Sequence, residues 1–455
     1  MQDLDLSTIK NVHFIGIGGI GISAVARMML HMGKKVSGQD MQGGEIVDEL
    51  MKLGIQIKIG QSYENIPKDA DLIVYTIAID TYDRELAEKI KGQSMIPVRS
   101  YPQMLDIISR DKYTIAIAGT HGKTTTTAMI AQILDEGGKS PTVIVGSLIK
   151  GNPNHSDGRA TNFIAGSSDI LVVEACEYRR SFLNINPKVL VITNIDEDHL
   201  DYYKDIEDIK SAFHAMAMKV PSDGFVVCNP SDENIADVIK GINAKVINWA
   251  EFYDSELKLK IPGIHNKKDA AAAVAAAATL GLSKEESKKY VCNFPGTWRR
   301  FEFKGKLVNG ALVYDDYAHH PHEITATMEG FRELYPKEAG WKITVVFQPH
   351  LFSRTKLLLN DFAQSFKNAD QVLILPIYYA REVDDGTISG EILSNEINKY
   401  TNNSEAFSSF EDLESYLGTQ LPNMRDKDII VTMGAGEAFK IGDYLLKENN
   451  SIIKR

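Results

Sequence analysis

A glycine-rich run at residues 119–125 has the composition of a phosphate-binding loop. The backbone N–H groups of such a turn can surround phosphate oxygens, Lys123 can reach the β- and γ-phosphates, and a threonine hydroxyl can bind Mg²⁺. Residue 117 is Ile, so the run is not the full G-x-x-x-x-G-K-[ST] pattern. We expect a nucleotide site here in preference to a purely structural turn. The candidate binding residues are Gly119, Thr120, His121, Gly122, Lys123, Thr124 and Thr125.

A second glycine run matches G-x-G-x-x-G at residues 16–21. Its glycines, which allow a close approach of the backbone to a diphosphate, are Gly16, Gly18, Gly19 and Gly21. Asp40 ends the next expected strand, where a carboxylate can accept a hydrogen bond from a ribose hydroxyl. Three interpretations stay open from these residues: a nicotinamide or flavin dinucleotide, another diphosphate ligand, or a tight turn without a ligand.

Carboxylates follow two further expected strands. Glu174 comes directly after residues 171–173, and the segment from Asn194 to His199 follows residues 189–193. In a doubly wound sheet the carboxyl ends of the strands line the ligand crevice. Glu174 and His199 are therefore candidates for binding Mg²⁺, although Mg²⁺ prefers oxygen and the histidine is the weaker inference. The acidic residues of the same loop are equally consistent with a solvated surface: Asp196, Asp198 and Asp201.

Three motifs in the last third of the chain also carry polar side chains that can do chemistry, at residues 298–302, 314–321 and 348–355. Arg299 can supply positive charge to a transferring phosphoryl group. Asp315 can accept from a ribose hydroxyl, and His350 with Arg354 can hold a small carboxylate. Each residue alone is more often structural, but together at expected strand ends they favour a site.

The elements that position these residues alternate between strand and helix, which predicts an α/β protein with parallel sheets. The first phosphate-loop-like turn connects an expected strand at 11–15 to a helix at 22–32, and the second connects 113–118 to 124–135. An alanine-rich stretch at 270–280 is expected to be a closely packed helix. Further strands are expected at 35–38, 72–75, 311–314, 343–347, 371–375 and 429–432. We expect three domains, at residues 1–110, 111–296 and 297–455.

Composition excludes several classes of protein. A net charge of −11 and a pI of about 5.6 argue against a general nucleic-acid surface. No apolar run approaches the roughly 18 residues of a membrane helix, and residues 1–12 lack the features of a secretory signal. Three widely spaced cysteines argue against a disulfide framework. We therefore expect a cytoplasmic protein with no nucleic-acid or membrane partner. A monomer or a homodimer is expected, and nothing in the sequence chooses between them.

The motifs together resemble the Mur ligase family, and within it the members that add L-alanine. The resemblance runs from residue 16 to residue 436 and rests on these segments: 16–21, 119–125, 174–182, 193–199, 263–266, and the motifs around Arg299, Asp315 and His350. It implies an N-terminal Rossmann-like domain for a UDP-sugar, a central P-loop ATPase domain and a C-terminal Rossmann-like domain. It also implies ATP-dependent ligation of L-alanine to UDP-N-acetylmuramate through an acyl phosphate, for peptidoglycan synthesis.

The resemblance also implies a role for each matching residue. The first glycine run, with Asp40 and Thr76, would hold UDP-N-acetylmuramate and not NAD. Mg²⁺ would lie among Thr124, Glu174 and His199. The ATP contacts beyond the phosphate loop would come from Asn194, Asn266, Arg299 and Asp315. The muramoyl side and the alanine would be held by His319, His320, His350 and Arg354.

Rival functions remain at this point. A nicotinamide dehydrogenase explains the first glycine run but leaves residues 119–125 without a role. An ATPase switch that only binds its ligands explains the middle of the chain but not the third set of motifs. Within the family, a tripeptide-recycling ligase or a ligase for another amino acid also fits.

Overall fold

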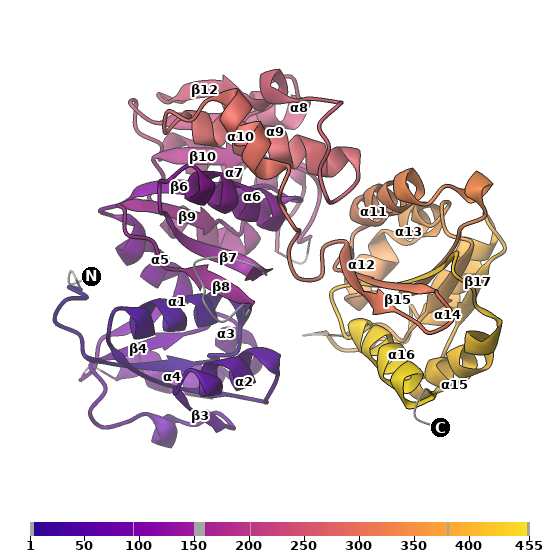
Figure 1. Ribbon diagram of the computed structural model, residues 1–455. Coiled ribbons are helices and arrows are strands. Elements are labelled where there is room, and N and C mark those ends of the chain that lie inside the picture. The colour runs from indigo at the N-terminus through magenta and orange to yellow at the C-terminus, as the bar shows by residue number, and fades with distance from the viewer. Residues whose placement is uncertain (1–3, 94, 150–159, 201, 380–381, 453–455) are drawn as a thin grey trace. The chain divides into compact units, whose positions relative to one another are not determined.

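The computed structural model describes residues 4–93, 95–149, 160–200, 202–379 and 382–452 (Figure 1). The chain forms two compact units. The larger unit comprises Met1–Lys258 and Lys268–Phe294, and the smaller comprises Leu259–Lys267 and Pro295–Arg455. Two of the three sheets belong to the larger unit and one to the smaller. The expected α/β architecture is confirmed, whereas the boundaries at 110 and 296 stay predictions.

The first sheet is wholly parallel, as expected from the alternation of strands and helices. Its strand order is β3 (Gln56–Ile59), β2 (Lys35–Asp40), β1 (Asn11–Ile15), β4 (Leu72–Tyr75) and β5 (Val98–Ser100). Strands β1 and β4 are almost fully buried and, apart from Asn11 and His13 of β1, consist of aliphatic and aromatic residues, which is the pattern of a strand covered on both faces. The first glycine run follows β1, so it leaves the sheet at its centre.

The helices of this sheet are α1 (Ile20–His31), α2 (Glu45–Lys52), α3 (Ile79–Tyr82), α4 (Arg84–Gly92) and α5 (Tyr101–Ser109). Helix α1 begins two residues earlier than expected and buries Val25 and Met29. It also packs against β7 and β8 of the second sheet (Figure 1). Helix α1 therefore packs against both sheets of the larger unit. The two glycine-rich runs thus belong to the same compact unit.

The second sheet has seven strands, parallel except for the antiparallel pair β7 and β8. Its order is β12 (Lys245–Asn248), β11 (Phe225–Cys228), β10 (Val189–Ile192), β6 (Tyr113–Ala118), β9 (Ile170–Glu174), β7 (Thr142–Ile149) and β8 (Thr161–Ile164). Strand β6 pairs with β10 on one side and β9 on the other. Since parallel strands end at the same edge, the segments after β6, β9 and β10 meet there.

The helices of the second sheet are α6 (Lys123–Glu136), α7 (Ile206–Met218), α8 (Glu233–Val238), α9 (Ile264–Ala278) and α10 (Lys284–Val291). Helix α6 ends at Gly137 and Gly138, as expected, with Gly138 in the left-handed region at φ +72°. The alanine-rich stretch is helical within α9, and residues 270–277 are buried. Small side chains let this helix approach its neighbours closely, as predicted from its composition.

The sheet of the smaller unit has six strands, and only the edge strand β13 is antiparallel to its neighbour. The order is β13 (Glu302–Lys306), β14 (Leu312–Asp316), β18 (Asp428–Met433), β15 (Lys342–Phe347), β16 (Gln371–Ile374) and β17 (Ser404–Ala406). Its helices are α11 (Pro321–Leu334), α12 (Phe352–Leu357), α13 (Leu359–Ser365), α14 (Gly390–Asn398), α15 (Phe410–Gln420) and α16 (Phe439–Ile452). Two apolar clusters fill this unit around the sheet.

None of the helices in the described parts of the chain combines the length and the apolar character needed to cross a bilayer.

Candidate active site

The loop at 119–122 is held by the segment that follows β10. The Thr120 N–H donates to the Asn194 carbonyl at 3.2 Å, and the Asp196 N–H donates to the Thr120 hydroxyl at 2.9 Å. The Asn194 side chain accepts from the His121 N–H at 2.9 Å and donates to the His121 carbonyl at 3.0 Å. Asn194, expected beside the nucleotide, therefore fixes the shape of the loop in this structure.

Two glycines of this loop have no room for a side chain. A Cβ on Gly119, at φ +145°, would lie 1.9 Å from the Thr193 hydroxyl oxygen. A Cβ on Gly122, at φ +79°, would lie 2.4 Å from a carboxylate oxygen of Asp269. The left-handed backbone and the close neighbours each require glycine, so the loop can present its N–H groups without obstruction.

Lys123 is folded back onto the loop that carries it. Its Nζ donates to the Gly119 carbonyl at 2.6 Å and to the Thr120 carbonyl at 2.9 Å, and it pairs with Glu177 at 3.0 Å. Burial opposes the charge, but the neighbouring Glu177 carboxylate raises the pKa of Lys123 above its ordinary value. The ammonium is therefore held in place and charged. Glu177, which is 2% exposed, was not expected from the sequence, because it follows β9 in a turn without periodic pattern.

Glu174 and Thr124 lie together beside this lysine. The Thr124 hydroxyl donates to Glu174 Oε1 at 3.0 Å, and the Gly146 N–H donates to Oε2 at 2.7 Å. A hydroxyl and a carboxylate next to a phosphate loop are the oxygen donors that suit Mg²⁺. Two of the three expected metal ligands are thus brought together, and their chemistry fits the ion.

His199, the third expected ligand, lies beside Glu177. Its Nε2 is 3.7 Å from Glu177 Oε1 and 3.8 Å from Asp198 Oδ2. Its ring centroid is 4.7 Å from that of Tyr178, and its backbone is left-handed at φ +55°. The imidazole is therefore within the same group of side chains as Lys123 and Glu177.

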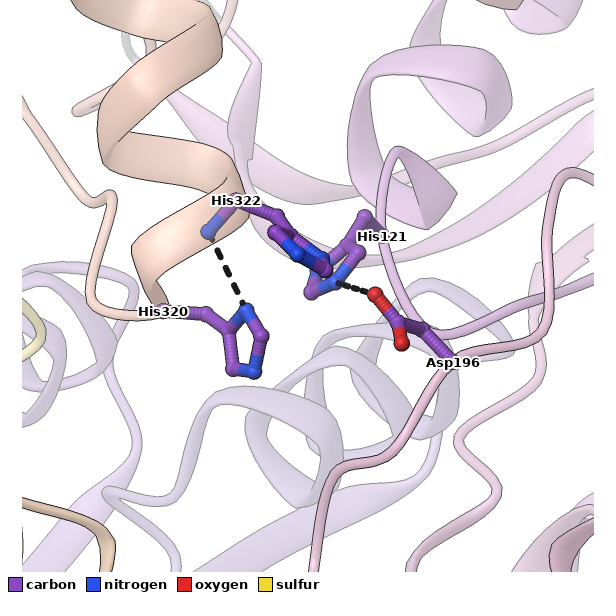
Figure 2. Close-up of side chains that lie close together, drawn as sticks. All are labelled: His121, Asp196, His320 and His322. Carbon is purple, nitrogen blue, oxygen red and sulfur yellow. Dashed lines mark hydrogen bonds and ion pairs between the residues drawn. The ribbon is translucent and has the colours of Figure 1, made fainter. Parts of the chain in front are cut away.

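The acidic loop after β10 has local partners. Asp196 Oδ2 is 3.7 Å from His121 Nε2, the pair drawn in Figure 2. Asp198 accepts from the His199 N–H at 2.7 Å. Asp201 lies outside the described residues. Asp196 and Asp198 therefore shape the turn that brings His199 towards Glu177.

The first glycine run is braced from two sides. The N–H groups of Gly16 and Ile17 donate to the Gln39 carbonyl at 2.9 and 3.2 Å, and the Gly18 N–H donates to Asp40 Oδ2 at 2.7 Å. Thr76 packs against the run, since a Cβ on Gly16 would lie 2.3 Å from its methyl carbon. Asp40 and Thr76 are thus brought to the run, and Asp40 binds the loop backbone in this structure.

A buried polar network that the sequence did not reveal lies behind the glycine run. Gln39 Oε1 accepts from the Ser62 N–H at 2.7 Å and from Asn65 at 3.1 Å, so its amide nitrogen faces His13 Nε2 at 3.1 Å. His13 Nδ1 is 2.9 Å from the Ser37 hydroxyl. Burial, with the charge of Lys58, lowers the pKa of His13 to about 4. His13 is therefore neutral, and Gln39 joins the glycine run to this network.

Tyr101 connects the first glycine run to the end of β9. A Cβ on Gly21 would lie 2.7 Å from its ring. Burial raises the pKa of Tyr101, as do the neighbouring Cys176 and Glu174 side chains. Tyr101 thus lies between the first glycine run and the side chains of Cys176 and Glu174 at the end of β9.

Arg299 and Asp315 form a buried pair in the smaller unit. Arg299 Nε donates to Asp315 Oδ2 at 2.7 Å, and its two terminal nitrogens donate to the carbonyls of Gly436 at 3.0 Å and Gly434 at 2.6 Å. Burial raises the pKa of Asp315, although the Arg299 charge opposes this. The guanidinium holds the glycine turn after β18 against β14.

The predicted histidines of the smaller unit fall into two groups. His319 Nδ1 is 3.2 Å from Glu323 Oε2, and the His319 and His350 ring centroids are 6.1 Å apart. His350 also stacks on Tyr378 at 5.5 Å. His320 caps α11 by accepting from the His322 N–H at 3.3 Å (Figure 2). His319 and His350 are therefore neighbours, while His320 starts a helix.

Arg354 and Asn266 complete the predicted set. Arg354 lies in α12, directly after the segment that carries His350, and is 8% exposed. Asn266 lies in the smaller unit at the start of α9, and its amide donates to the Pro262 carbonyl at 2.5 Å. Arg354 therefore lies four residues after His350 along the chain. Asn266 lies in the first turn of α9.

Three family models match the chain in succession. The Mur ligase family catalytic domain matches residues 11–113, the Mur ligase middle domain matches 117–254, and the Mur ligase glutamate ligase domain matches 299–436. These spans contain the first glycine run, the phosphate loop and the Arg299–Asp315 pair respectively.

Curated relatives and solved structures are similar over almost the whole chain. The UDP-N-acetylmuramate–L-alanine ligase of Acetivibrio thermocellus is 40% identical, with 99% of this chain and 98% of that protein covered. The enzyme of that name from Caldanaerobacter subterraneus subsp. tengcongensis is 39% identical, with 98% and 100% covered. The crystal structure of the Thermotoga maritima UDP-N-acetylmuramate–alanine ligase has a TM-score of 0.76 at 27% identity, covering 97% and 99%. A murein peptide ligase from Psychrobacter arcticus shares the fold, with a TM-score of 0.69 at 24% identity, covering 97% and 98%.

Proposed function

Because this chain belongs to the Mur ligase family, we propose that it joins L-alanine to the carboxylate of UDP-N-acetylmuramate at the expense of ATP. The observation that carries the choice of substrates is the 40% identity to an alanine-adding relative over 99% of the chain. The Lys123, Thr124 and Glu174 group at the ends of β6 and β9 supports it, because this reaction needs a site for phosphoryl transfer.

Direct amide formation from a carboxylate fails because hydroxide is a poor leaving group. In the proposed reaction a muramoyl carboxylate oxygen attacks the γ-phosphorus of ATP, and the bond to the β,γ-bridging oxygen breaks to release ADP. The neutral amine of alanine then attacks the carbonyl carbon of the acyl phosphate. Phosphate leaves with the C–O electron pair, and the amine loses its proton.

Lys123 is the residue proposed to act on the transferring phosphoryl group. Its ammonium is charged and lies at the loop whose N–H groups would face the phosphates. When ATP binds, the ammonium would leave the Gly119 and Thr120 carbonyls and donate to phosphate oxygens instead. In that position it would stabilise the negative charge of the transition state. Glu177 keeps this cation close to the loop until the nucleotide binds.

Mg²⁺ would be held by Thr124 and Glu174, with His199 beside them. When bound it would neutralise charge on the ATP phosphates. In the same proposal the UDP-sugar binds at Gly16, Gly18, Gly19 and Gly21, with Asp40 and Thr76. Asn194 fixes the shape of the phosphate loop through its side-chain hydrogen bonds to the His121 backbone.

The smaller unit is proposed to supply the remaining contacts. These are Asn266, Arg299 and Asp315 for ATP, His319 and His320 for the muramoyl group, and His350 and Arg354 for alanine. We place the reaction in the cytoplasm, where the free thiols of Cys176, Cys228 and Cys292 stay reduced. The proposed assembly is a monomer or a homodimer.

The acyl-phosphate route is tested with substrate that carries heavy oxygen in the muramoyl carboxylate. One heavy oxygen is expected in the released phosphate, because the attacking carboxylate oxygen leaves with it. Released phosphate without the label would contradict this route, even if the amide product formed.

A further inference from the structure

A left-handed turn after β9 places a cation against α3, in the segment that follows β4. Arg179 (φ +51°, ψ +30°) and Arg180 (φ +55°, ψ +25°) are consecutive non-glycine residues in the left-handed region, within the 3₁₀ segment η2 (Tyr178–Asn184). Such conformations are strained for residues other than glycine and persist where surrounding contacts fix them. The contacts of the two arginines show what this turn achieves.

Arg180 anchors the turn. Its guanidinium donates to Asp208 Oδ1 at 2.6 Å and lies over the Tyr203 ring at 5.8 Å. Tyr178, on the other side, faces the His199 ring, and Glu177 holds Lys123. Residues 177–180 therefore form one short segment, in which Glu177 contacts the lysine of the phosphate loop and Arg179 contacts Thr81.

Arg179 reaches the segment after β4, whose Thr76 and Tyr82 pack against Gly16 of the first glycine run. Its Nη2 donates to the Thr81 hydroxyl at 3.0 Å, and Thr81 is the neighbour of Tyr82 in α3. A Cβ on Gly16 would lie 3.6 Å from the Tyr82 hydroxyl. Within the described residues, no carboxylate lies within ion-pair distance of Arg179, whose contacts are Thr81 and the Tyr178 ring. The guanidinium thus retains donors for another acceptor.

The loops around the glycine run lack a cation of their own. Residues 15–21 and 76–83 contain no Lys or Arg, and they contribute Asp80 and Asp83, while Asp40 binds the Gly18 N–H. Lys91 is paired with Asp80. Within these two segments, a diphosphate at the start of α1 would meet the partial positive charge of the helix but no Lys or Arg. Arg179, hydrogen-bonded to Thr81 in the second of these segments, is a full positive charge contributed by the segment after β9.

We propose that Arg179 binds the diphosphate of the UDP-sugar substrate and, through the turn it shares with Glu177, aligns that substrate with the phosphate loop. This inference rests on the proposed function, since it names a further residue for the same sugar nucleotide. A planar guanidinium suits the paired oxygens of a diphosphate better than an ammonium does.

Two ligands distinguish binding of Arg179 to the diphosphate from binding to the carboxylate of the substrate. UDP-N-acetylmuramate has both a diphosphate and a carboxylate, whereas UDP-N-acetylglucosamine has the diphosphate alone. Binding of each to the full chain is measured by titration calorimetry. Arg179→Gln is expected to weaken both ligands by the same factor, about tenfold. Arg179→Lys is expected to fall between this variant and the wild type, because it keeps the charge but not the fork.

Control variants isolate the role of the guanidinium. Arg84→Gln removes one positive charge from exposed helix α4 and is expected to leave both affinities within about twofold. Thr81→Val removes the hydrogen bond to Arg179, and a small effect is expected. If Thr81→Val reproduced Arg179→Gln in full, Arg179 would only hold α3 in place and the proposal would be overturned.

The remaining outcomes are equally distinct. Unchanged affinity in Arg179→Gln, with normal binding by the wild type, would overturn the assignment of Arg179 and leave the proposed function intact. Weakening confined to UDP-N-acetylmuramate would show a carboxylate contact and contradict the diphosphate assignment. A wild-type chain that binds neither sugar nucleotide would contradict the proposed function itself. ATP affinity and melting temperature close to wild type confirm that the variant is folded.

Discussion

Lys123 Nζ lies 3.0 Å from a carboxylate oxygen of Glu177, and both side chains are largely buried. The same ammonium also donates to two carbonyls of its own loop. A buried carboxylate that loses the ammonium paired with it costs far more than the pair contributes. The relationship therefore links the stability of the larger unit to the chemistry proposed for it.

Lys123→Ala is expected to lower both activity and stability. Phosphate release should fall about a thousandfold, because a charge that stabilises the transferring phosphoryl group is lost. Unfolding free energy should fall by about 3–5 kcal/mol, because Glu177 stays buried without its partner. The double variant Lys123→Met/Glu177→Gln should recover most of the stability but none of the activity. A single variant that melts like the wild type would contradict the coupling.

Glu174→Gln is expected to raise the Mg²⁺ concentration for half-maximal activity by roughly 10- to 100-fold. The amide keeps the shape of the carboxylate but not its charge. Glu197→Gln is the matched control, because Glu197 is an exposed acid in the loop after β10. Titration of activity with Mg²⁺ checks both variants, and an equal shift in the two would refute a specific role for Glu174.

Gly119→Ala is expected to abolish activity, because its Cβ would lie 1.9 Å from the Thr193 hydroxyl oxygen and force the loop open. Gly138→Ala is the comparison, since Gly138 is also at positive φ but has no atom within 4 Å of a Cβ. That variant should lose about 1 kcal/mol of stability and keep its activity. Comparing the activity and the melting temperature of the two variants separates the effect of the contact with Thr193 from the effect of backbone strain alone.

His13 is expected to make the chain less stable in mild acid. Its pKa in the folded chain, about 4, is below the ordinary value of 6.5, so the neutral form is favoured by folding. The contribution is therefore fully present above pH 6.5 and is lost as the pH falls from 6.5 to 4, by roughly 3 kcal/mol in total. Melting temperatures of wild type and His13→Gln across this range should converge towards pH 4. Parallel curves would show that His13 does not titrate there.

The sequence predicted the strands that lead into the site, and the residues at their ends, because buried apolar runs followed by glycine turns are local signals. Glu174 is the last residue of β9, and Asn194 follows β10 as expected. The edge strand β13 was not predicted, since it has no buried residue, no regular alternation of exposure, and a glycine in its interior. The inner strands β7 and β11 are buried and were also not predicted, so burial alone did not make a strand readable from the sequence.

The contacts of the site residues were less predictable than their positions. Glu177 and Arg179 belong to an irregular turn, and no periodicity marks which of its side chains point inwards. The pairing of Arg299 with Asp315 and the two glycine carbonyls joins residues up to 137 positions apart. Such contacts depend on how strands are ordered in the sheet, which a motif alone does not specify.

The most direct test of the central claim is release of phosphate from ATP with Mg²⁺ and UDP-N-acetylmuramate, with and without individual amino acids. The account predicts release that requires the sugar nucleotide and is fastest with L-alanine, together with a UDP-sugar product that carries one alanine. Fastest release with another amino acid would keep the family and change the substrate. No release with any combination would contradict the account.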